Sequence, residues 1–338
     1  MLKAEETETP RLLMCIFREV WERETIPEAW KTGLFVKLPK KGDLGNCDNW
    51  RGVTLPPITS KVLSKIIHTR LAEAVDECIR QEQAGFRRGR SCSDHIFTLR
   101  QILELSKEWN APLYANFIDF EKAFDSIHRD SLWKILKHYG IPSKLVNVIK
   151  MLYSDFKSQV ICNTALTDAF SVTTGVKQGC ILSPFVFILG IDWVLRQLTS
   201  GVRKGIRWTL TSVLEDLDYA DDVVLLVHRH QGMQDKTNAL ATTAGNIGLK
   251  INIKKTRHLR MSSRNNESIL VNGEVVDEVD HFTYLGSKVS TSGDGEEEIL
   301  VRISKASQAF ASLRSNLEIQ EHQSEDKDPI LQKQYLKL

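Results

Sequence analysis

The chain alternates between short helical and short extended segments and contains no internal repeat. Apolar residues at helical spacing predict helices over 11–24, 59–79, 93–109, 129–139, 143–156, 183–198, 235–247 and 301–317. Short apolar runs bounded by turn residues predict strands or hairpins over 33–39, 113–118, 159–163, 169–173, 217–227, 249–253, 268–276 and 282–289. Because the two kinds of element do not form regular βαβ units, the pattern predicts an α+β fold.

Three details of this pattern add local expectations. Ser93 is expected to cap the helix over 93–109. The mostly apolar segment 183–198 is expected to form a buried helix. The apolar periodicity disappears after residue 317, so the polar segment 318–338 is expected to be a disordered tail.

The composition is that of an ordinary globular protein, with 42% hydrophobic and 26% charged residues among 338. This length favours two domains or one large multi-lobed domain. The longest apolar stretch, Cys180–Ile191, is shorter than the roughly 18 residues of a membrane span, so no membrane association is expected. The acidic N-terminus does not resemble a signal peptide. Six widely separated cysteines predict neither a zinc module nor a disulfide framework, which favours a reducing, intracellular location.

Charge is unevenly distributed on a chain whose net charge is only +2. The segment 250–260 carries five lysines and arginines and no acid, and 31–51 and 80–100 also have basic excess. Such faces can bind a polyanion even on a near-neutral chain. The alternative is that each run is a solvated surface, which is common for isolated basic runs.

Aspartates at the ends of predicted strands are the strongest chemical signal. Asp119 closes the strand over 113–118, and Asp221 and Asp222 form the tip of the hairpin over 217–227. Carboxylates that converge on one point repel each other unless a divalent cation neutralises them. Mg²⁺ suits such a set, and two ions about 3.5–4 Å apart perform nucleotidyl transfer. The alternative is a helix cap at Asp119 and an ordinary turn pair at Asp221 and Asp222.

An ordered series of motifs decides between these alternatives, because it resembles the boxes of reverse transcriptases. The motif Tyr219–Asp222 resembles the YxDD box of that family. Further resemblances follow in the family order, at 40–43, 49–55, 116–125, 175–184, 248–256 and 284–286. The segment 83–91 is characteristic of the branch of non-LTR (LINE-type) retrotransposons. The resemblance covers residues 27–317.

The resemblance implies a right-hand polymerase fold with fingers and a palm built on an antiparallel sheet. The expected division is an N-terminal helical extension (1–26), fingers (27–112), a palm with motifs A to E (113–292), the start of a thumb helix (293–317) and the tail (318–338). The thumb is expected to be truncated and an upstream endonuclease to be absent. Two departures from the family pattern are Gly52, where proline is common, and the Leu55-Pro56-Pro57 run.

The implied activity is that of an RNA-directed DNA polymerase, which adds dNTPs to the 3′-hydroxyl of a DNA primer on an RNA template. Its cofactors would be two Mg²⁺ ions, with Mn²⁺ as an alternative. The runner-up hypothesis is a catalytically inactive, truncated retroelement remnant that binds RNA or DNA. A purely structural protein would leave the ordered motifs unexplained. Family members copy DNA at a nuclear target, so a nuclear location is implied by resemblance alone.

The resemblance also assigns roles to individual residues. Asp119, Asp221 and the carbonyl of Phe120 would bind the metal ions, Asp222 would support them electrostatically, and Lys254 or Lys255 would protonate the leaving pyrophosphate. The residues expected to bind the incoming nucleotide are Lys40, Lys41, Arg51, Phe120, Phe124, Gln178, Gly179 and Tyr219. The residues expected to contact nucleic acid are Arg87, Arg88, Arg90, Tyr284, Leu285 and Gly286.

Overall fold

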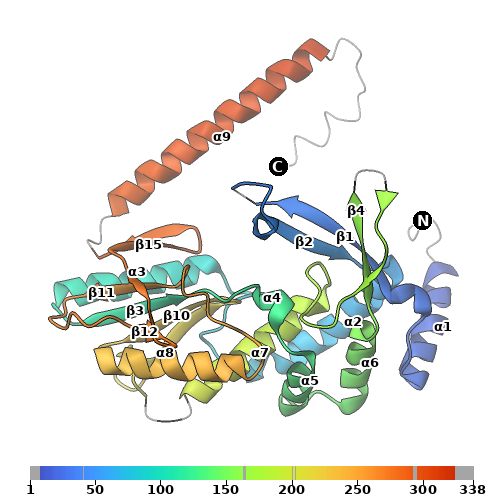
Figure 1. Ribbon diagram of the computed structural model, residues 1–338, viewed down its shortest axis with the longest axis horizontal. Helices are drawn as coiled ribbons and strands as arrows, with labels where there is room; N and C mark the ends of the chain where they lie inside the picture. The colour runs from blue at the N-terminus through green and yellow to red at the C-terminus, as the bar shows by residue number, and fades with distance from the viewer. Residues whose placement is uncertain are drawn as a thin grey trace.

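The computed structural model describes residues 8–40, 42–162, 165–199, 201, 203–291 and 295–323. Lys41, one of the predicted nucleotide-binding residues, and the segment 324–338 lie outside this range. Two sheets organise the chain, one around β3, β10 and β11 and the other around β1, β2 and β4 (Figure 1). The predicted α+β class is therefore confirmed.

The first sheet is antiparallel at its centre. Its strand order is β14 (Asp277–Glu278), β11 (Arg257–Met261), β3 (Leu113–Ile118), β10 (Asp222–Val227) and β9 (Asp216–Tyr219). Only the β11–β14 pair is parallel, and β3 lies between β11 and β10. This order places the end of β3, where Asp119 follows, beside the β9–β10 turn.

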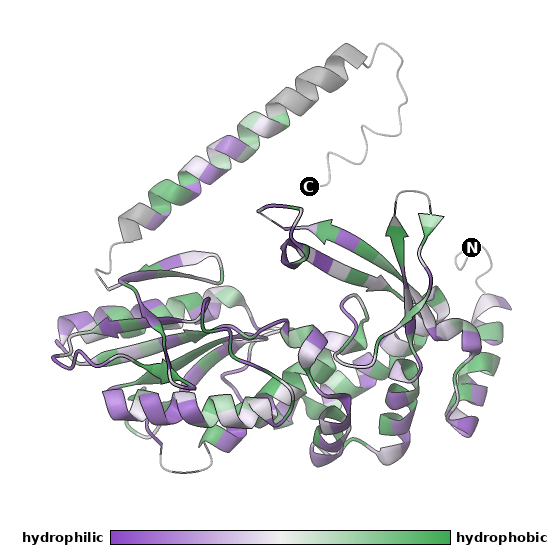
Figure 2. Cartoon of the chain, viewed as in Figure 1, coloured by the Kyte–Doolittle hydropathy of each residue, from purple (hydrophilic) through white to green (hydrophobic). Residues whose placement is uncertain are grey.

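Both faces of this sheet are covered, by α3 (Cys92–Glu108) on one side and α8 (His230–Gly245) on the other (Figure 1). The strands therefore carry apolar side chains on both faces, as Figure 2 shows for the central strands. Along β10, Val223 and Leu225 join the core beneath α8, whereas Val224 and Leu226 join the core with α3. Alternate side chains of the strand thus pack into two separate hydrophobic cores.

The second sheet has the order β2 (Trp50–Leu55), β1 (Thr32–Pro39), β4 (Lys157–Cys162) and β5 (Ala165–Leu166), and β6 (Phe170–Ser171) also pairs with β4. The β1–β2 pair is an antiparallel hairpin, and β4 joins β1 in parallel. The continuous fingers range predicted from the sequence, 27–112, therefore misses the strands over 157–171. It also includes α3, which packs on the other sheet. Strand pairing between distant segments is not visible in local periodicity.

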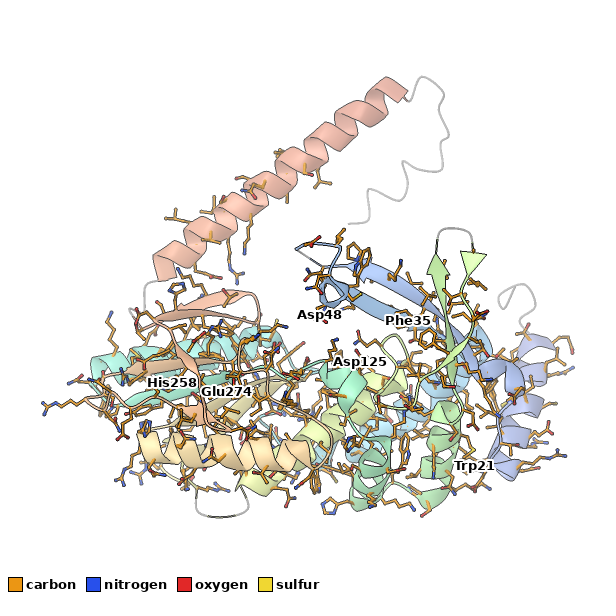
Figure 3. The ribbon with its side chains drawn as sticks, viewed as in Figure 1. Trp21, Phe35, Asp48, Asp125, His258 and Glu274 are labelled. Atoms are coloured by element: carbon orange, nitrogen blue, oxygen red, sulfur yellow. The ribbon has the colours of Figure 1, made fainter. Side chains whose placement is uncertain are left out.

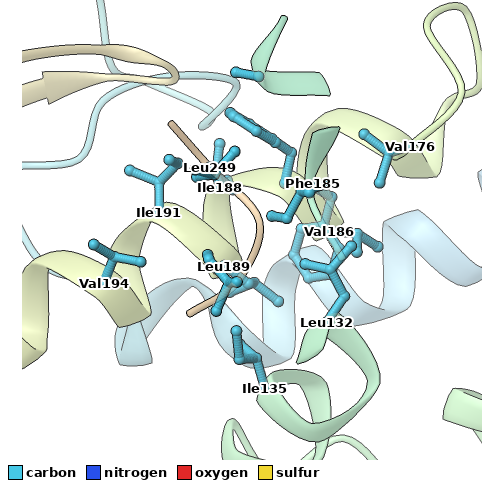
Figure 4. Packing of buried hydrophobic residues seen from close by; sticks show 14 of the residues in the cluster. Leu132, Ile135, Val176, Phe185, Val186, Ile188, Leu189, Ile191, Val194 and Leu249 are labelled. Carbon is cyan, nitrogen blue, oxygen red and sulfur yellow. The ribbon is translucent and has the colours of Figure 1, made fainter. Parts of the chain in front are cut away.

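The helix α7 (Leu182–Thr199) forms the centre of the larger core. It packs on α2 (Ile58–Val75), α5 (Arg129–His138) and α8. Figure 4 shows apolar side chains of α7 beside Leu132 and Ile135 of α5. By length and composition it could cross a membrane, but 67% of its window is buried inside the protein. It is the buried core helix that its apolar sequence predicts.

The remaining helices and small hairpins surround these two sheets. They are α1 (Glu8–Arg23), η1 (Glu28–Trp30), η2 (Cys47–Asn49), η3 (Asp76–Cys78), α4 (Ala123–Ser126), α6 (Ser143–Tyr153), β7 (Ile206–Arg207), β8 (Val213–Leu214), β12 (Leu270–Val271), β13 (Glu274–Val275), β15 (His281–Tyr284), β16 (Ser287–Ser290) and α9 (Gly295–Gln323). The helix α9 extends away from both sheets (Figure 1).

Four local predictions need correction. The segment 249–253 forms only an isolated bridge between Ile251 and Phe120, and the strand is instead β11. The predicted strand over 282–289 is the hairpin β15–β16, because Leu285 and Gly286 adopt positive φ values of 48° and 82° and reverse the chain. The cap of α3 is Ser91, whose hydroxyl accepts from the Ser93 amide. The helix α9 includes residues 318–323, which were expected to be disordered.

Candidate active site

The turn between β9 and β10 presents two adjacent aspartates. Tyr219 pairs with Asp222 across the hairpin, so Ala220 and Asp221 form a two-residue turn. Ala220 has a φ of 59°, a left-handed conformation that a residue with a Cβ adopts at a cost of roughly 1–2 kcal/mol. The turn therefore holds Asp221 and Asp222 in a defined, strained geometry.

Asp119 lies beside this turn, because Ile118 at the end of β3 pairs with Val223 at the start of β10. Burial raises the pKa of Asp119, the Lys255 ammonium opposes the rise, and the Asp221 carboxylate adds to it. Burial also raises the pKa of Asp221, and the Arg51 guanidinium opposes that rise. The pKa of Asp222 is raised to about 6 by the loss of water around its carboxyl and then by the charges of Asp221 and Asp119. The three carboxylates predicted from the sequence thus converge.

The carboxylate oxygens of this cluster suit a hard divalent cation. The Oδ1 atom of Asp119 is buried without a hydrogen-bond partner, and the nearest ammonium, Lys255 Nζ, is 3.9 Å away. The Asp221 charge raises the pKa of both Asp119 and Asp222, and a bound cation would relieve this repulsion and give the buried oxygen a partner. Within the described residues, no three His, Cys, Asp or Glu side chains are arranged so that they alone could hold a metal ion. Mg²⁺ needs no such arrangement, since it takes much of its shell from water and phosphates.

The segment after α8 fixes the backbone around Asp119. The Asn252 amide donates to the Asp119 carbonyl at 2.8 Å, and the Glu121 amide donates to the Lys250 carbonyl at 2.8 Å. Neither bond uses the carbonyl of Phe120, which could therefore serve as a ligand. The same segment brings Lys255, rather than its neighbour Lys254, into the ion pair with Asp119.

Phe124 forms the aromatic wall next to the acidic cluster. Its ring stacks on Phe187 of α7, with ring centroids 4.3 Å apart, and meets the edge of Phe86 at 6.5 Å. The ring is therefore both a part of the core and a partly exposed surface. Its orientation is fixed by packing rather than by hydrogen bonds.

Gln178 and Gly179 connect the helix α7 to the β1–β2 hairpin. The amide of Thr54 in β2 donates to the Gln178 carbonyl at 2.6 Å. Gly179 has a φ of 103°, and a Cβ there would lie 2.4 Å from the Thr54 carbonyl oxygen. The Gln178 side chain donates to the Asp125 carboxylate at 3.3 Å. Only glycine permits this close approach of the two backbones.

The tip of the β1–β2 hairpin faces the segment that carries Lys122 and Asp125. Lys122 forms a 3.0 Å ion pair with Asp48, which Figure 3 shows across from Asp125. Lys40 donates to the Asp48 carbonyl at 3.1 Å, and its charge lowers the pKa of Asp125 against the dominant rise caused by burial. Arg51 on β2 is exposed and acts electrostatically on Asp221. The predicted cations Lys40 and Arg51 are thus near acids, Lys40 near Asp125 and Arg51 near Asp221.

A comparison with known families agrees with this geometry. The sequence model described as reverse transcriptase (RNA-dependent DNA polymerase) matches residues 38–289, well over half of the chain. The chain belongs to the reverse transcriptase family.

Relatives of this reverse transcriptase chain are proteins of transposable elements. It is 29% identical over 250 residues to an uncharacterized 149 kDa protein of transposon TX1 from Xenopus laevis, covering 72% of the chain and 19% of that protein. It is 27% identical over 292 residues to a Pol polyprotein of the R2 element from Popillia japonica, covering 80% and 39%. The predicted membership of the non-LTR branch is confirmed. The chain spans well under half the length of these relatives.

Solved structures support the right-hand polymerase fold of this reverse transcriptase chain. A telomerase from Candida albicans in complex with a fragment of telomeric RNA has a TM-score of 0.56, covering 84% of the chain and 49% of that protein at 11% identity. A telomerase from Candida tropicalis in a similar complex has a TM-score of 0.54, covering 85% and 49% at 13% identity. At these identities the likeness concerns the fold alone.

One predicted nucleic-acid contact of this reverse transcriptase chain is contradicted by burial. The Arg87 guanidinium is buried, forms an ion pair with Asp76 at 2.8 Å, and donates to the carbonyls of Arg80, Gln83 and Asp76. Its donors are thus engaged within the protein, where they brace the loop. Arg88 and Arg90 are exposed, and Arg90 donates to the Gln81 side chain.

In the predicted primer-contacting motif, Tyr284–Gly286, the tyrosine is buried and the other two residues form a turn. The Tyr284 ring is buried against Phe117, with ring centroids 5.8 Å apart, and its hydroxyl lies 3.5 Å from Nδ1 of His95. Its side chain therefore supports the β15–β16 hairpin and does not reach a ligand. Leu285 and Gly286 form the turn of that hairpin. Tyr219 directly precedes the Ala220–Asp221 turn between β9 and β10, which is called the catalytic turn below after its proposed role. The Tyr219 ring is partly exposed and meets His95 edge to face, with ring centroids 6.2 Å apart.

Sequence reasoning missed the residues that lie directly behind the catalytic turn. Gln83 is fully buried and hydrogen-bonds to the turn itself, and Arg80 forms ion pairs with Asp192, Asp216 and Asp218. The signal in the sequence was the position of Gln83 at the start of the 83–91 motif, with Arg80 three residues before it. Their basic and polar character made them look like part of a solvated loop.

Proposed function

We propose that this chain is an RNA-directed DNA polymerase, which extends the 3′-hydroxyl of a DNA primer on an RNA template. The observation that supports this most strongly is the convergence of Asp119, Asp221 and Asp222 with an unpartnered buried oxygen, in a chain of the reverse transcriptase family. Related proteins carry the names RNA-directed DNA polymerase from mobile element jockey and from transposon BS, both of Drosophila melanogaster.

The acidic cluster would bind the divalent cations. Asp119, Asp221 and the Phe120 carbonyl are the proposed ligands, and Asp222 adds negative charge from the same turn. When bound, Mg²⁺ or Mn²⁺ would lower the pKa of the primer hydroxyl and neutralise charge on the transferred phosphate. The cations would also offset the burial that raises the pKa values of these acids and the repulsion that adds to it at Asp119 and Asp222.

Basic residues around the cluster would handle the triphosphate. Arg51 and Lys40 would bind its oxygens from the β1–β2 hairpin, and a guanidinium can do so with two parallel hydrogen bonds. Lys41 is the alternative lysine for this role. Lys255 is the proposed general acid, since its Nζ could give a proton to the leaving pyrophosphate. Lys254 is exposed, and the described structure shows no ion pair between it and Asp119.

The nucleotide and the template strand would be positioned by packing. We infer that Phe124 lies under the sugar and excludes a 2′-hydroxyl, because its stack on Phe187 prevents it from moving aside. Gln178 and Gly179 would lie beside the incoming base and template, and Tyr219 would line the catalytic turn. Exposed Arg88 and Arg90 would contact template phosphates, and the turn at Leu285 and Gly286 would contact the primer.

We further propose a division of labour among the parts of the chain. Residues 27–91 together with 157–171 would form the fingers, and 92–156 with 172–292 would form the palm and the helices beneath it. The long helix α9 would be the first thumb helix, and 1–26 an N-terminal helical extension. The location would be intracellular, with a nuclear site of action.

Primer extension tests this function. The chain would be assayed on poly(rA)/oligo(dT) with dTTP and Mg²⁺, beside Asp221→Asn and the control Asp130→Asn, an exposed aspartate on α5. Extension should fall by about 10²–10³-fold or more in Asp221→Asn and stay unchanged in Asp130→Asn. Equal extension by parent and Asp221→Asn would refute the metal-ligand assignment. A folded parent that binds the duplex without extending it would refute the polymerase and favour a nucleic-acid-binding remnant.

A further inference from the structure

A buried polar network supports the catalytic turn from behind, and Gln83 lies at its centre. The Gln83 side chain has no exposed surface. Its Oε1 accepts from the amide of Ala220 at 3.0 Å and from the amide of Gly85 at 2.7 Å. Its Nε2 donates to Oδ2 of Asp218 at 2.6 Å. One amide group therefore connects the loop before the basic segment to both ends of the Asp218–Ala220 segment.

The backbone reinforces this connection. The Ala84 amide donates to the Asp218 carbonyl at 2.9 Å, and Gln83 forms a parallel bridge with Asp218. A Cβ on Gly85 would lie 2.3 Å from the amide nitrogen of Ala220. The two segments are therefore in direct contact along several residues, without room for water between Gly85 and the turn.

On the far side, Arg80 anchors Asp218. Its guanidinium donates to Oδ1 of Asp218 at 3.0 Å, to Asp216 at 2.7 Å and to Asp192 of α7 at 3.1 Å. Asp192 in turn accepts from Tyr139 and Arg196. The carboxylate that receives the Gln83 amide is thus itself fixed, so Gln83 cannot rotate without losing bonds at both ends.

Ala220 is the residue that most needs this support. It has a left-handed φ of 59°, and it directly precedes Asp221. Nothing in the side chain of alanine favours that conformation, in contrast to asparagine or glycine. The hydrogen bond from the Ala220 amide to Gln83 therefore stabilises the turn conformation in which Asp221 lies near Asp119.

We propose that Gln83 is a positioning residue for catalysis, which holds the Ala220 amide and thereby sets the geometry with which Asp119 and Asp221 bind a divalent cation. The kinetic consequence rests on the proposed polymerase function, whereas the cation-binding consequence does not. Residues that orient metal ligands in this way typically change metal affinity or activity by about 10–100-fold when removed.

The test uses Gln83→Met, which keeps the chain length and removes the amide. Asn116→Leu is the matched control, since Asn116 is an equally buried amide in the same sheet that bonds to Thr237 and His258 instead of the turn. Gln83→Asn is the second variant, because it keeps an amide that is too short to reach both Asp218 and Ala220. For each protein, Mn²⁺ affinity is measured by electron paramagnetic resonance, with Kd for the primer–template duplex, kcat for extension and the melting temperature.

The expected result is a loss of Mn²⁺ affinity of about tenfold or more in Gln83→Met, with a matching fall in kcat and a duplex Kd within about twofold of the parent. Gln83→Asn should move in the same direction, and Asn116→Leu should lower only the melting temperature. If Gln83→Met does not fold, Gln83→Asn carries the test alone. Unchanged Mn²⁺ affinity in a folded Gln83 variant would overturn the proposal, as would equal losses in Asn116→Leu. A parent that binds Mn²⁺ but extends no primer would refute the polymerase function alone.

Discussion

Replacing Arg80 by methionine would remove the cation that, among the described residues, forms ion pairs with Asp192, Asp216 and Asp218 together. The Arg80 side chain is 9% exposed, and those of Asp192 and Asp218 have no exposed surface. Its three ion pairs have lengths of 2.7–3.1 Å. Arg196 still reaches Asp192, but Asp216 and Asp218 would lose the ion-pair partner that the described residues give them. Methionine keeps most of the volume, so the change tests charge rather than packing.

The expected loss of stability follows from burial. Removing one partner from a buried ion pair costs about 3–5 kcal/mol, because the remaining charge is left in a poorly solvated site. At roughly 2–4 °C per kcal/mol for a domain of this size, the melting temperature should fall by on the order of 10 °C. Arg23→Met is the control, since Arg23 pairs with Glu19 at 3.0 Å with both side chains exposed. An exposed pair is worth about 0–1 kcal/mol.

The loss should also depend on pH. Burial raises the pKa of Asp218 well above its ordinary value, and the Arg80 charge opposes that rise. Without Arg80 the pKa rises further, so the folded variant binds a proton that the unfolded chain releases near pH 4. The destabilisation is then largest at pH 8 and smaller at pH 5. Thermal unfolding followed by circular dichroism measures both effects. Equal melting temperatures for the parent and Arg80→Met at pH 8 would refute the prediction that the Arg80 charge stabilises the fold by neutralising these buried aspartates.

Three further predictions concern the catalytic site. Phe124→Val should raise the use of rUTP relative to dTTP in primer extension by roughly tenfold or more, and an unchanged ratio would exclude Phe124 as the sugar-contacting wall. Gly179→Ala should lower extension and cost about 1–2 kcal/mol of unfolding free energy through strain, in addition to a clash with Thr54. Gly140→Ala, also at positive φ but in open space, should show only the strain. In EDTA, Asp222→Asn should melt at a higher temperature than the parent at pH 7.5 but not at pH 4. The reason is that the pKa of Asp222 is raised to about 6, so above that pH its ionised form is unfavourable in the folded protein. A lower melting temperature for Asp222→Asn at pH 7.5 would contradict the predicted repulsion.

The elements with a clear period were predictable from the sequence. The strand over 113–118 has the predicted bounds, and the hairpin ending in two aspartates lies beside it as expected. One failure concerns the segment 249–260, which contains the basic run. Its apolar residues at 249, 251 and 253 resemble a strand, but only Ile251 forms a bridge. The true strand, β11, was hidden by its charges, since Arg257 and Arg260 extend from the sheet to Asp277 and Glu278.

Charge in the sequence also failed to show which arginines are buried. Arg87 and Arg88 are adjacent in a basic loop, yet one is enclosed by Asp76 and three backbone carbonyls and the other is exposed. A buried arginine needs partners distant in the chain or in backbone geometry, and neither is visible in local composition. The same limit hid Arg80, whose acidic partners are more than 100 residues away.

Only the structure distinguishes the aspartates of the proposed active site from those that anchor the hairpin around it. Four aspartates occur within seven residues, at 216, 218, 221 and 222. Asp216 and Asp218 are buried and paired with Arg80, whereas Asp221 and Asp222 lie at the turn, where Arg51 acts on Asp221 only through its charge. The first pair is neutralised within the protein, and the second pair keeps its negative charge available for a cation. One short segment thus holds both the acids proposed to bind a cation and the acids that anchor the segment, and the Gln83 amide connects Asp218 of the anchoring pair to the Ala220 amide beside Asp221.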